Sequence, residues 1–269
     1  MKVRDKVIVV TGGGSGMGRE LVLGLLGKGA RVAAIDINAD NLAETASLSG
    51  DKAASLATFV VDVTDRKAVE ELPEKVIGRF HDVDGVINNA GIIQPFVKVN
   101  DLGYPTIERV LNVNLYGTIY MTKTFQPHLL GRSEAHIVNI SSMGGFVPVP
   151  GQALYGASKA AVKLLTEGLA SELAGTGVRV TVVFPGAVST NITVNSGVKG
   201  FELPADQQQQ RIKILSAAAA AQIIIDGIER DRPRVLVGSD AKFMDFFSRL
   251  NTVGAGRMIQ KRMGALLKS

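Results

Sequence analysis

The stretch Thr11-Gly12-Gly13-Gly14-Ser15-Gly16-Met17-Gly18 follows directly on an apolar run from Val7 to Val10. Five of its eight residues are glycines, which let a backbone turn tightly and approach a ligand that side chains would keep away. The apolar run indicates a buried strand, and a helical pattern begins at Arg19. Unpaired N–H groups and the dipole at a helix N-terminus favour phosphate. The stretch therefore predicts a phosphate-binding turn between a first strand and a first helix.

Three well-known loops do not match this turn. The dinucleotide fingerprint G-x-G-x-x-G finds its three glycines in no register. A Walker loop requires Lys and Ser/Thr after its last glycine, whereas Gly18 is followed by Arg19-Glu20. The nucleophile elbow G-x-S-x-G fails because Met17 stands where its second glycine is needed. The spacing that remains is Thr-Gly-x-x-x-Gly-x-Gly.

The composition restricts the chemistry that the chain can perform. There is no cysteine, which excludes disulfides, thiolate catalysis and sulfur-ligated metals. His81, His128 and His136 are scattered without metal-ligand spacing, so we expect no bound metal. The net charge is +5, but aromatic residues are few and no run of Lys or Arg exceeds two residues, so we expect no nucleic-acid partner. No apolar run approaches the roughly 18 residues of a membrane span, and the first residues lead straight into a strand, so we expect a cytoplasmic protein.

Short β-branched runs alternate with helical patterns along most of the chain. The expected strands are Val7 to Val10, Val32 to Ile35, Phe59 to Val61, Val83 to Ile87, Ile137 to Ile140, Val178 to Phe184 and Val235 to Val237. Helical patterns include Arg19 to Lys28, Lys67 to Arg79 and Ala157 to Leu173. Because most strands are apolar on both faces, we predict an α/β protein with a doubly wound parallel sheet. We expect a single domain over residues 1–240, with a substrate lid at about 190–212, and a C-terminal tail over 241–269.

Two further features suggest a dinucleotide and an acid/base group. Asp36 ends the second expected strand, where its carboxylate can accept hydrogen bonds from a ribose diol. Tyr155 and Lys159 stand at i and i+4, on one face of a helix. An ammonium beside a phenol lowers its pKa, which makes Tyr155 a candidate general acid/base. Ser142 closes the fifth strand at the same sheet edge as the glycine turn.

Together these residues resemble the short-chain dehydrogenase/reductase family in order and spacing. The resemblance runs from about residue 5 to residue 190 and is carried by Thr11–Gly18, Asp62-Val63, Asn88–Gly91, Asn114, Ser142, Tyr155, Lys159 and Pro185-Gly186. It implies a single-domain Rossmann fold and an NAD(P)-dependent oxidoreductase. The glycine turn then corresponds to the pyrophosphate-binding turn of that family.

The resemblance also implies roles for individual residues. Tyr155 would exchange a proton with the substrate oxygen while Ser142 hydrogen-bonds that oxygen. Lys159 would hold the nicotinamide ribose, and Asn114 would anchor a water in the proton relay. Both Ser142 and Tyr155 would thus contact substrate as well as act in catalysis. The cofactor contacts implied are Gly12, Ser15, Gly16, Met17, Gly18, Asp36, Ile37, Asp62, Val63, Asn89, Ala90, Gly91, Tyr155, Lys159, Pro185, Gly186, Val188 and Thr190.

The cofactor and the substrate follow from the residues at the expected site. Asp36 would repel a 2′-phosphate, and neither Met17 nor Ile37 is basic, so we predict NAD rather than NADP. An NADPH-dependent carbonyl reductase and a non-catalytic dinucleotide sensor remain as alternatives. We expect a largely apolar secondary alcohol or ketone, because the candidate wall residues are apolar: Ile93, Met143, Phe146, Val149, Val194, Val198, Phe201 and Leu203.

The helix that contains Tyr155 and the C-terminal tail lead to predictions on assembly and on contact surfaces. The helix with Tyr155 and Lys159 continues with more apolar and small residues than one buried face requires, and we predict a homodimer or homotetramer. Apolar residues recur at helical spacing twice in the tail, which predicts two short amphipathic helices, one before and one after Gly254 and Gly256. The first group is Phe243, Phe246, Phe247 and Leu250, and the second is Ile259, Met263, Leu266 and Leu267. Six basic residues and one acid follow Ala241, so this segment fits docking on the domain or a neighbouring subunit, or contact with an anionic membrane; we favour docking.

Overall fold

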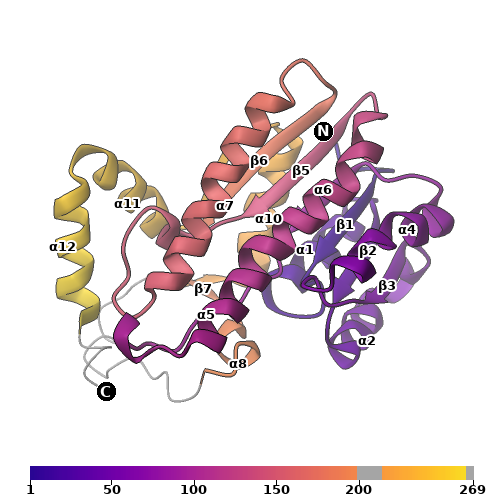
Figure 1. Cartoon of the computed structure of the whole chain (residues 1–269). Coiled ribbons are helices and arrows are strands. Elements are labelled where there is room, and N and C mark those ends of the chain that lie inside the picture. Colours follow the sequence, from indigo (N-terminus) through magenta and orange to yellow (C-terminus); the bar gives the residue numbers. More distant parts are fainter. Residues whose placement is uncertain (199–213, 265–269) are drawn as a thin grey trace.

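The computed structural model describes residues 1–198 and 214–264 and is built on one seven-stranded parallel sheet (Figure 1). The strand order is β3-β2-β1-β4-β5-β6-β9. The strands are β1 (Val7–Thr11), β2 (Arg31–Asp36), β3 (Leu56–Val60), β4 (Gly85–Asn88), β5 (Ala135–Ile140), β6 (Val178–Pro185) and β9 (Arg234–Val237). Two short strands, β7 (Val188–Ser189) and β8 (Leu215–Ser216), pair separately. The predicted doubly wound α/β fold is confirmed.

Helices cover both faces of the sheet. The α-helices are α1 (Gly16–Gly27), α2 (Ala39–Leu48), α3 (Arg66–Glu70), α4 (Leu72–Phe80), α5 (Tyr104–Leu111), α6 (Gly117–Leu130), α7 (Ala153–Glu172), α8 (Ile192–Asn195), α10 (Ala217–Glu229), α11 (Ser239–Leu250) and α12 (Thr252–Met263). Short 3₁₀ segments are η1 (Gly50–Ser55), η2 (Val99–Asp101) and η4 (Met143–Gly145), and η3 (Asn112–Tyr116) is a π-helical turn between α5 and α6. Among the described residues, no helix is long and apolar enough to cross a membrane.

The core has two layers, one on each face of the sheet. In β1, Ile8 and Val10 face α1 and α10, whereas Val7 and Val9 face the layer of α4, α6 and α7. Strands buried on both faces give continuous apolar runs, and this explains why β1 contains no polar residue before Thr11. In Figure 1, α6 and α7 lie in front of the sheet, and α1 and α10 lie behind it.

The strand order reverses between β1 and β4, and this reversal positions the site. β2 and β3 extend from one side of β1, and β4, β5, β6 and β9 extend from the other. The loops that leave β1 and β4 therefore diverge and open a crevice beyond the carboxyl ends of the strands. In open α/β sheets, ligands bind in this crevice.

Two expected helices have different boundaries. The pattern from Lys67 to Arg79 forms two helices that meet at Glu71, because Pro73 in the first turn of α4 has no N–H to continue α3. In the tail, Gly254 and Gly256 lie inside α12 rather than before it. The side chain of Asn251 caps this helix by accepting from the Gly254 N–H at 2.7 Å, so the helix begins earlier than the glycines suggested.

Candidate active site

The glycine turn requires the absence of side chains at two positions. A Cβ on Gly18 would overlap the carbonyl oxygen of Gly12, so the chain can pass itself here only if residue 18 is glycine. Gly12 has a φ of +67°, a region that favours glycine. Its own Cβ would lie 2.9 Å from Nδ2 of Asn89. The turn is thus packed against the end of β4 and leads its backbone N–H groups into α1.

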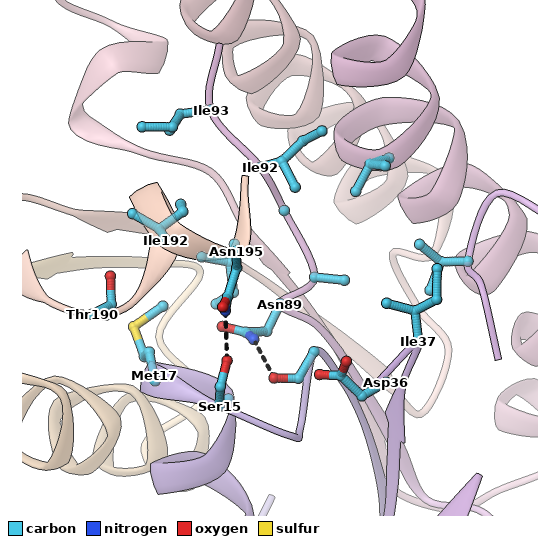
Figure 2. A pocket seen from close by; sticks show the side chains of 18 of the residues that line it. Ser15, Met17, Asp36, Ile37, Asn89, Ile92, Ile93, Thr190, Ile192 and Asn195 are labelled. Atoms are coloured by element: carbon cyan, nitrogen blue, oxygen red, sulfur yellow. Dashed lines mark hydrogen bonds between the residues drawn. The ribbon is translucent and has the colours of Figure 1, made fainter. Parts of the chain in front are cut away.

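Thr11 and Asn89 fasten this turn to the segment that follows β4. The Thr11 hydroxyl accepts hydrogen bonds from the N–H groups of Asn89 and Ala90, both at 3.0 Å. The Asn89 side chain in turn donates to the Thr11 carbonyl at 3.0 Å. This reciprocal pairing holds the two edges of the crevice together where β1 and β4 diverge. Figure 2 shows the Asn89 side chain above Ser15, with the hydrogen bond that it donates drawn as a dashed line.

Asp36 and Arg19 fix the other side of the turn. One carboxylate oxygen of Asp36 accepts from the Gly14 N–H at 3.0 Å, and the other accepts from the Asn38 N–H at 3.0 Å. Arg19 donates twice to the Gly14 carbonyl, at 2.6 and 3.0 Å, and pairs with Glu44 at 2.6 Å. The Arg19 guanidinium is therefore used within the protein, whereas the Asp36 carboxylate lines the cavity.

Tyr155, Ser142 and Lys159 meet at the carboxyl edge of β5. The Ser142 hydroxyl lies next to the Tyr155 phenol and accepts from the Gly144 N–H at 3.0 Å. Lys159 is buried one helical turn beyond Tyr155, and its Nζ donates to the Ile140 carbonyl at 2.9 Å. A Cβ on Gly91 would lie 3.1 Å from Nζ of Lys159, so the segment after β4 reaches this group as well.

The electrostatics of Tyr155 differ from the expectation. Burial raises the pKa of the Tyr155 phenol, and the hydrogen bond with Ser142 opposes this rise only in part. The prediction that the ammonium of Lys159 lowers this pKa is wrong for this arrangement. The Nζ atom lies 6.0 Å from the centre of the Tyr155 ring and is directed to the Ile140 carbonyl. Burial also lowers the pKa of Lys159 from 10.5 to about 8.

Asn114 lies beside this group but does not line the cavity. It is completely buried in the π-helical turn η3, and single π turns are frequent at functional sites. Its Oδ1 accepts from the Ile92 N–H at 2.8 Å, and its Nδ2 donates to the Ile92 carbonyl at 2.9 Å and to the Ser158 hydroxyl at 3.0 Å. The side chain thus connects the segment after β4 with α7.

The loop after β6 closes the end of the cavity at which the sequence predicts nicotinamide contacts. Pro185 pairs with Val237 of β9, and the Gly186 N–H donates to the Val237 carbonyl at 2.9 Å. The carboxylate of Asp240, in the first turn of α11, accepts from the Ala187 N–H at 2.6 Å. A Cβ on Gly186 would overlap that carboxylate, so glycine is needed there. The C-terminal elements therefore hold this loop in place.

The short helix α8 crosses the mouth of the cavity. Asn195 donates to the Ser15 hydroxyl of the glycine turn at 2.8 Å, a contact drawn in Figure 2. On the other side, the Ser196 hydroxyl accepts from the Ile93 N–H at 2.9 Å. These two bonds connect the first part of the expected lid to both edges of the crevice.

One cavity of about 790 Å³ is lined by all eighteen predicted cofactor residues, together with Ile93 and Ser142. Phe146, predicted to contact substrate, does not line it, because its ring packs edge-on against Phe184 with centroids 5.3 Å apart. Met143 joins Phe146 in a separate apolar cluster with residues of α11 and α12. Phe201 and Leu203 lie outside the described residues.

Gln94 is a residue of the site that sequence reasoning missed. It is completely buried, and its Oε1 accepts from the N–H groups of Leu154 and Tyr155 at 2.9 and 3.0 Å. Its Nε2 donates to the Gly151 carbonyl at 2.9 Å. Gln94 therefore caps the helix that carries Tyr155. No local signal points to this role, since the partners lie about sixty residues further along the chain.

The fold, the glycine turn and the group around Tyr155 define a nucleotide-dependent oxidoreductase of the Rossmann type. Residues 6–199 match the short chain dehydrogenase family, and the chain belongs to this family. The sequence is 38% identical over 253 residues to a Mycobacterium tuberculosis protein named as an oxidoreductase, SadH, with 91% of this chain and 90% of that protein covered. The chain is thus an NAD(P)-dependent short-chain dehydrogenase/reductase.

Solved structures of similar proteins contain both forms of the dinucleotide. A short-chain dehydrogenase/reductase from Burkholderia phymatum in complex with NAD has a TM-score of 0.79 and 29% identity, with 88% of this chain and 90% of that chain covered. ElxO with NADP bound has a TM-score of 0.77 and 26% identity, with 87% of this chain and 97% of that chain covered. The likeness to known proteins therefore leaves the choice between NAD and NADP to the residues of the site.

Proposed function

We propose that this protein transfers a hydride between NAD(H) and a largely apolar secondary alcohol or ketone, with Tyr155 as general acid/base. The observation that carries this proposal is the position of Tyr155, Ser142 and Lys159 in the same cavity as the glycine turn and Asp36. A dinucleotide bound along the glycine turn supplies or accepts the hydride. All other steps belong to side chains of the protein.

Tyr155 is suited to give a proton to a carbonyl oxygen. Because burial keeps its pKa above the ordinary value, the phenol carries its proton at neutral pH. Ser142 would turn its single hydroxyl proton from Tyr155 to the same substrate oxygen and so orient that oxygen. Lys159, which lines the same cavity, would hold the nicotinamide ribose.

The residues around Asp36 support NAD over NADP. Two cationic side chains line the cavity within the described part of the chain, Arg109 and Lys159. Arg109 donates to the Ser196 carbonyl at 3.4 Å, and Lys159 lies beside Tyr155, so neither one is placed at Asp36. A 2′-phosphate at Asp36 would meet a carboxylate with no neutralising partner. We expect NADH to bind more than tenfold more tightly than NADPH, a difference of about 1.4 kcal/mol.

Fluorescence titration of NADH and NADPH tests this preference. The double variant Asp36→Ser/Ile37→Arg removes the carboxylate and adds a cation at an exposed position, so it should reverse the preference. Asp40→Ser removes an exposed carboxylate four residues further along and serves as the matched control. Equal affinities of the unaltered protein for the two nucleotides would make NADPH-dependent carbonyl reduction the better description.

The described wall of the cavity supports an apolar substrate. Ile92, Ile93 and Ile192 line it on the side away from Asp36, as Figure 2 shows. A screen of secondary alcohols, ketones, steroids and sugars with NAD(H) tests the substrate class. Preferred turnover of polyols would contradict it, and no turnover with any compound would favour a dinucleotide sensor. We further propose a homodimer or homotetramer in the cytoplasm, testable by light scattering, in which a stable monomer would contradict the assembly.

A further inference from the structure

The helix α11 turns most of its apolar side away from the domain, and of that side only Phe247 is half-buried against the inner cluster. The buried positions of α11 are Ala241, Met244, Asp245 and Ser248, of which only Met244 is large and apolar. On the opposite side, Phe243, Phe246 and Leu250 are exposed to 51%, 65% and 70%. A surface helix normally buries its apolar side, and exposed apolar residues that gather on one side indicate an interaction site. This reversal could not be recognised from helical spacing, which shows the apolar side but not where it faces.

The charged side chains around this apolar side are all basic. We call the exposed apolar and basic residues of the two C-terminal helices the outward face; it comprises Lys242, Phe243, Phe246, Arg249, Leu250, Val253, Arg257 and Lys261, and the exposed uncharged polar residues of these helices are Ser239, Thr252 and Gln260. The carboxylate of Asp240 accepts from the Ala187 N–H, and that of Asp245 pairs with Arg234 and Arg249. No other acidic residue lies in α11 or α12. Among the described residues, Lys242, Arg257 and Lys261 of the outward face have no acidic partner, whereas Arg249 pairs with Asp245.

The charge of the chain is concentrated in this segment. From Ala241 onward there are six basic residues and one acidic residue, an excess equal to the whole net charge of +5. The remainder of the chain is therefore neutral overall. Figure 1 shows α11 and α12 at one side of the molecule, away from α2 and α4. The described basic residues Lys242, Arg249, Arg257 and Lys261 place positive charge on this side of the protein, and positive charge attracts anionic surfaces.

The sequence favours docking of this segment, and its inner side packs on the domain. We propose that the outward face, which this packing leaves exposed, binds an anionic lipid surface. A helix with apolar residues on one side and basic residues beside them lies in the interface of such a surface, where the rings and the Leu side chain enter the acyl boundary and the cations meet headgroups. A second copy of the chain is the less suitable occupant. Two copies related by a two-fold axis through this face would bring the same cations against one another.

The inner side of the helix pair connects this face to the active site. Met244, Ala255 and Ile259 pack against Val147, which lies in the loop that follows Ser142. A lipid surface on the outward face would therefore be separated by α11 and α12 from the loop that follows Ser142, and Ser142 itself lines the cavity. An apolar alcohol or ketone dissolved in lipid would be concentrated there. This consequence rests on the proposed function, whereas the lipid contact itself does not.

Flotation with vesicles tests the proposal on the full chain. We expect the protein to float with vesicles of phosphatidylcholine and phosphatidylglycerol at low salt, at least about tenfold more than with phosphatidylcholine alone, and to be released at high salt, because exposed charges are screened. Phe246→Ser/Leu250→Ser should abolish flotation, and so should Lys242→Glu/Lys261→Glu, which keeps the apolar residues. Leu48→Ser removes a leucine that is exposed to 56% in α2 and should float as the unaltered protein does.

Controls separate this proposal from the others. An unchanged melting temperature would show that each variant is folded, and an unchanged NADH affinity would show that the cofactor site is intact. NADH titration thus tests the cofactor proposal separately from flotation, which tests the lipid contact. Absence of flotation of the unaltered protein on anionic vesicles would overturn the lipid proposal. If in addition Phe246→Ser/Leu250→Ser lowers the mass measured by light scattering, a second copy covers the outward face.

Discussion

Replacement of Gln94 by alanine tests whether the start of α7 positions Tyr155. The Gln94 Oε1 accepts from the N–H groups of Leu154 and Tyr155, which lie in the first turn of α7 and have no partner within the helix. Because Gln94 is completely buried, water cannot replace it without rearrangement. Alanine would therefore leave two N–H groups and the Gly151 carbonyl without their partner.

The magnitude follows from these bonds. A lost helix cap costs about 1 kcal/mol, and a buried donor left without a partner costs about 1–3 kcal/mol. We expect the free energy of unfolding to fall by about 2–4 kcal/mol, with the first turn of α7 displaced toward water. A misplacement of about 1 Å at a reacting group lowers turnover by about 10²-fold. Lys159 lies a turn further along α7, so NADH affinity should change little.

Turnover, NADH affinity and melting temperature are the three measurements needed. Gln94→Glu keeps an acceptor for the two N–H groups but loses the donor to the Gly151 carbonyl, so its turnover should lie between that of the unaltered protein and that of Gln94→Ala. Thr181→Val is the control for stability, since Thr181 is buried and bonds to His136 and Arg232, outside the cavity residues. It should lower the melting temperature with turnover unchanged. If Gln94→Ala loses stability to the same extent as Thr181→Val and retains turnover as well, Gln94 has no role in positioning Tyr155.

Three other predictions follow from the cavity. Gly18→Ala should abolish NADH binding because its Cβ overlaps the Gly12 carbonyl, whereas Gly27→Ala, with no atom within 4 Å of the added Cβ, should bind NADH normally; equal binding by both would contradict the assigned turn. Asp240→Ala removes the acceptor of the Ala187 N–H and should weaken NADH binding about tenfold, an effect of the size of one charged hydrogen bond. Asp245 lies in the same helix as Asp240 and pairs with Arg234 of β9, and Asp245→Ala should leave NADH binding unchanged. The pKa of Lys159 is lowered from 10.5 to about 8, so its side chain is charged below pH 8 and neutral above it. NADH affinity should therefore decline as the pH rises through about 8. An affinity that does not change with pH would show that Lys159 takes no part in cofactor binding.

The parallel sheet and the glycine turn could be predicted because their signals are local. Each strand is an apolar run bounded by turn residues, and the requirement for glycine at residue 18 comes from a contact six residues away. Asp36 and the residues that follow β4 could be placed because parallel strands end at a common edge. The order of these residues along the chain therefore already describes most of the cavity lining.

The remaining features depend on contacts between distant residues. Gln94 caps a helix that begins at Ala153, and Asp240 holds a loop at Ala187, so neither role has a pattern in the surrounding sequence. The pKa of Tyr155 depends on burial and on where the Lys159 ammonium is directed, and helical spacing determines neither. The direction of the apolar side of α11 was likewise hidden, because it depends on the side chains that anchor the helix.

Replacement of Tyr155 by phenylalanine tests the central claim most directly. The change removes one hydroxyl from the cavity and leaves the glycine turn, Asp36 and Lys159 in place, so NADH affinity should remain that of the unaltered protein. Turnover should fall by about 10²-fold or more because the proton donor is lost. Tyr116→Phe, which removes a hydroxyl from a partly exposed residue of the π turn, should be without effect. Near-normal turnover of Tyr155→Phe with the best alcohol or ketone would contradict the assignment of Tyr155 as the acid/base group.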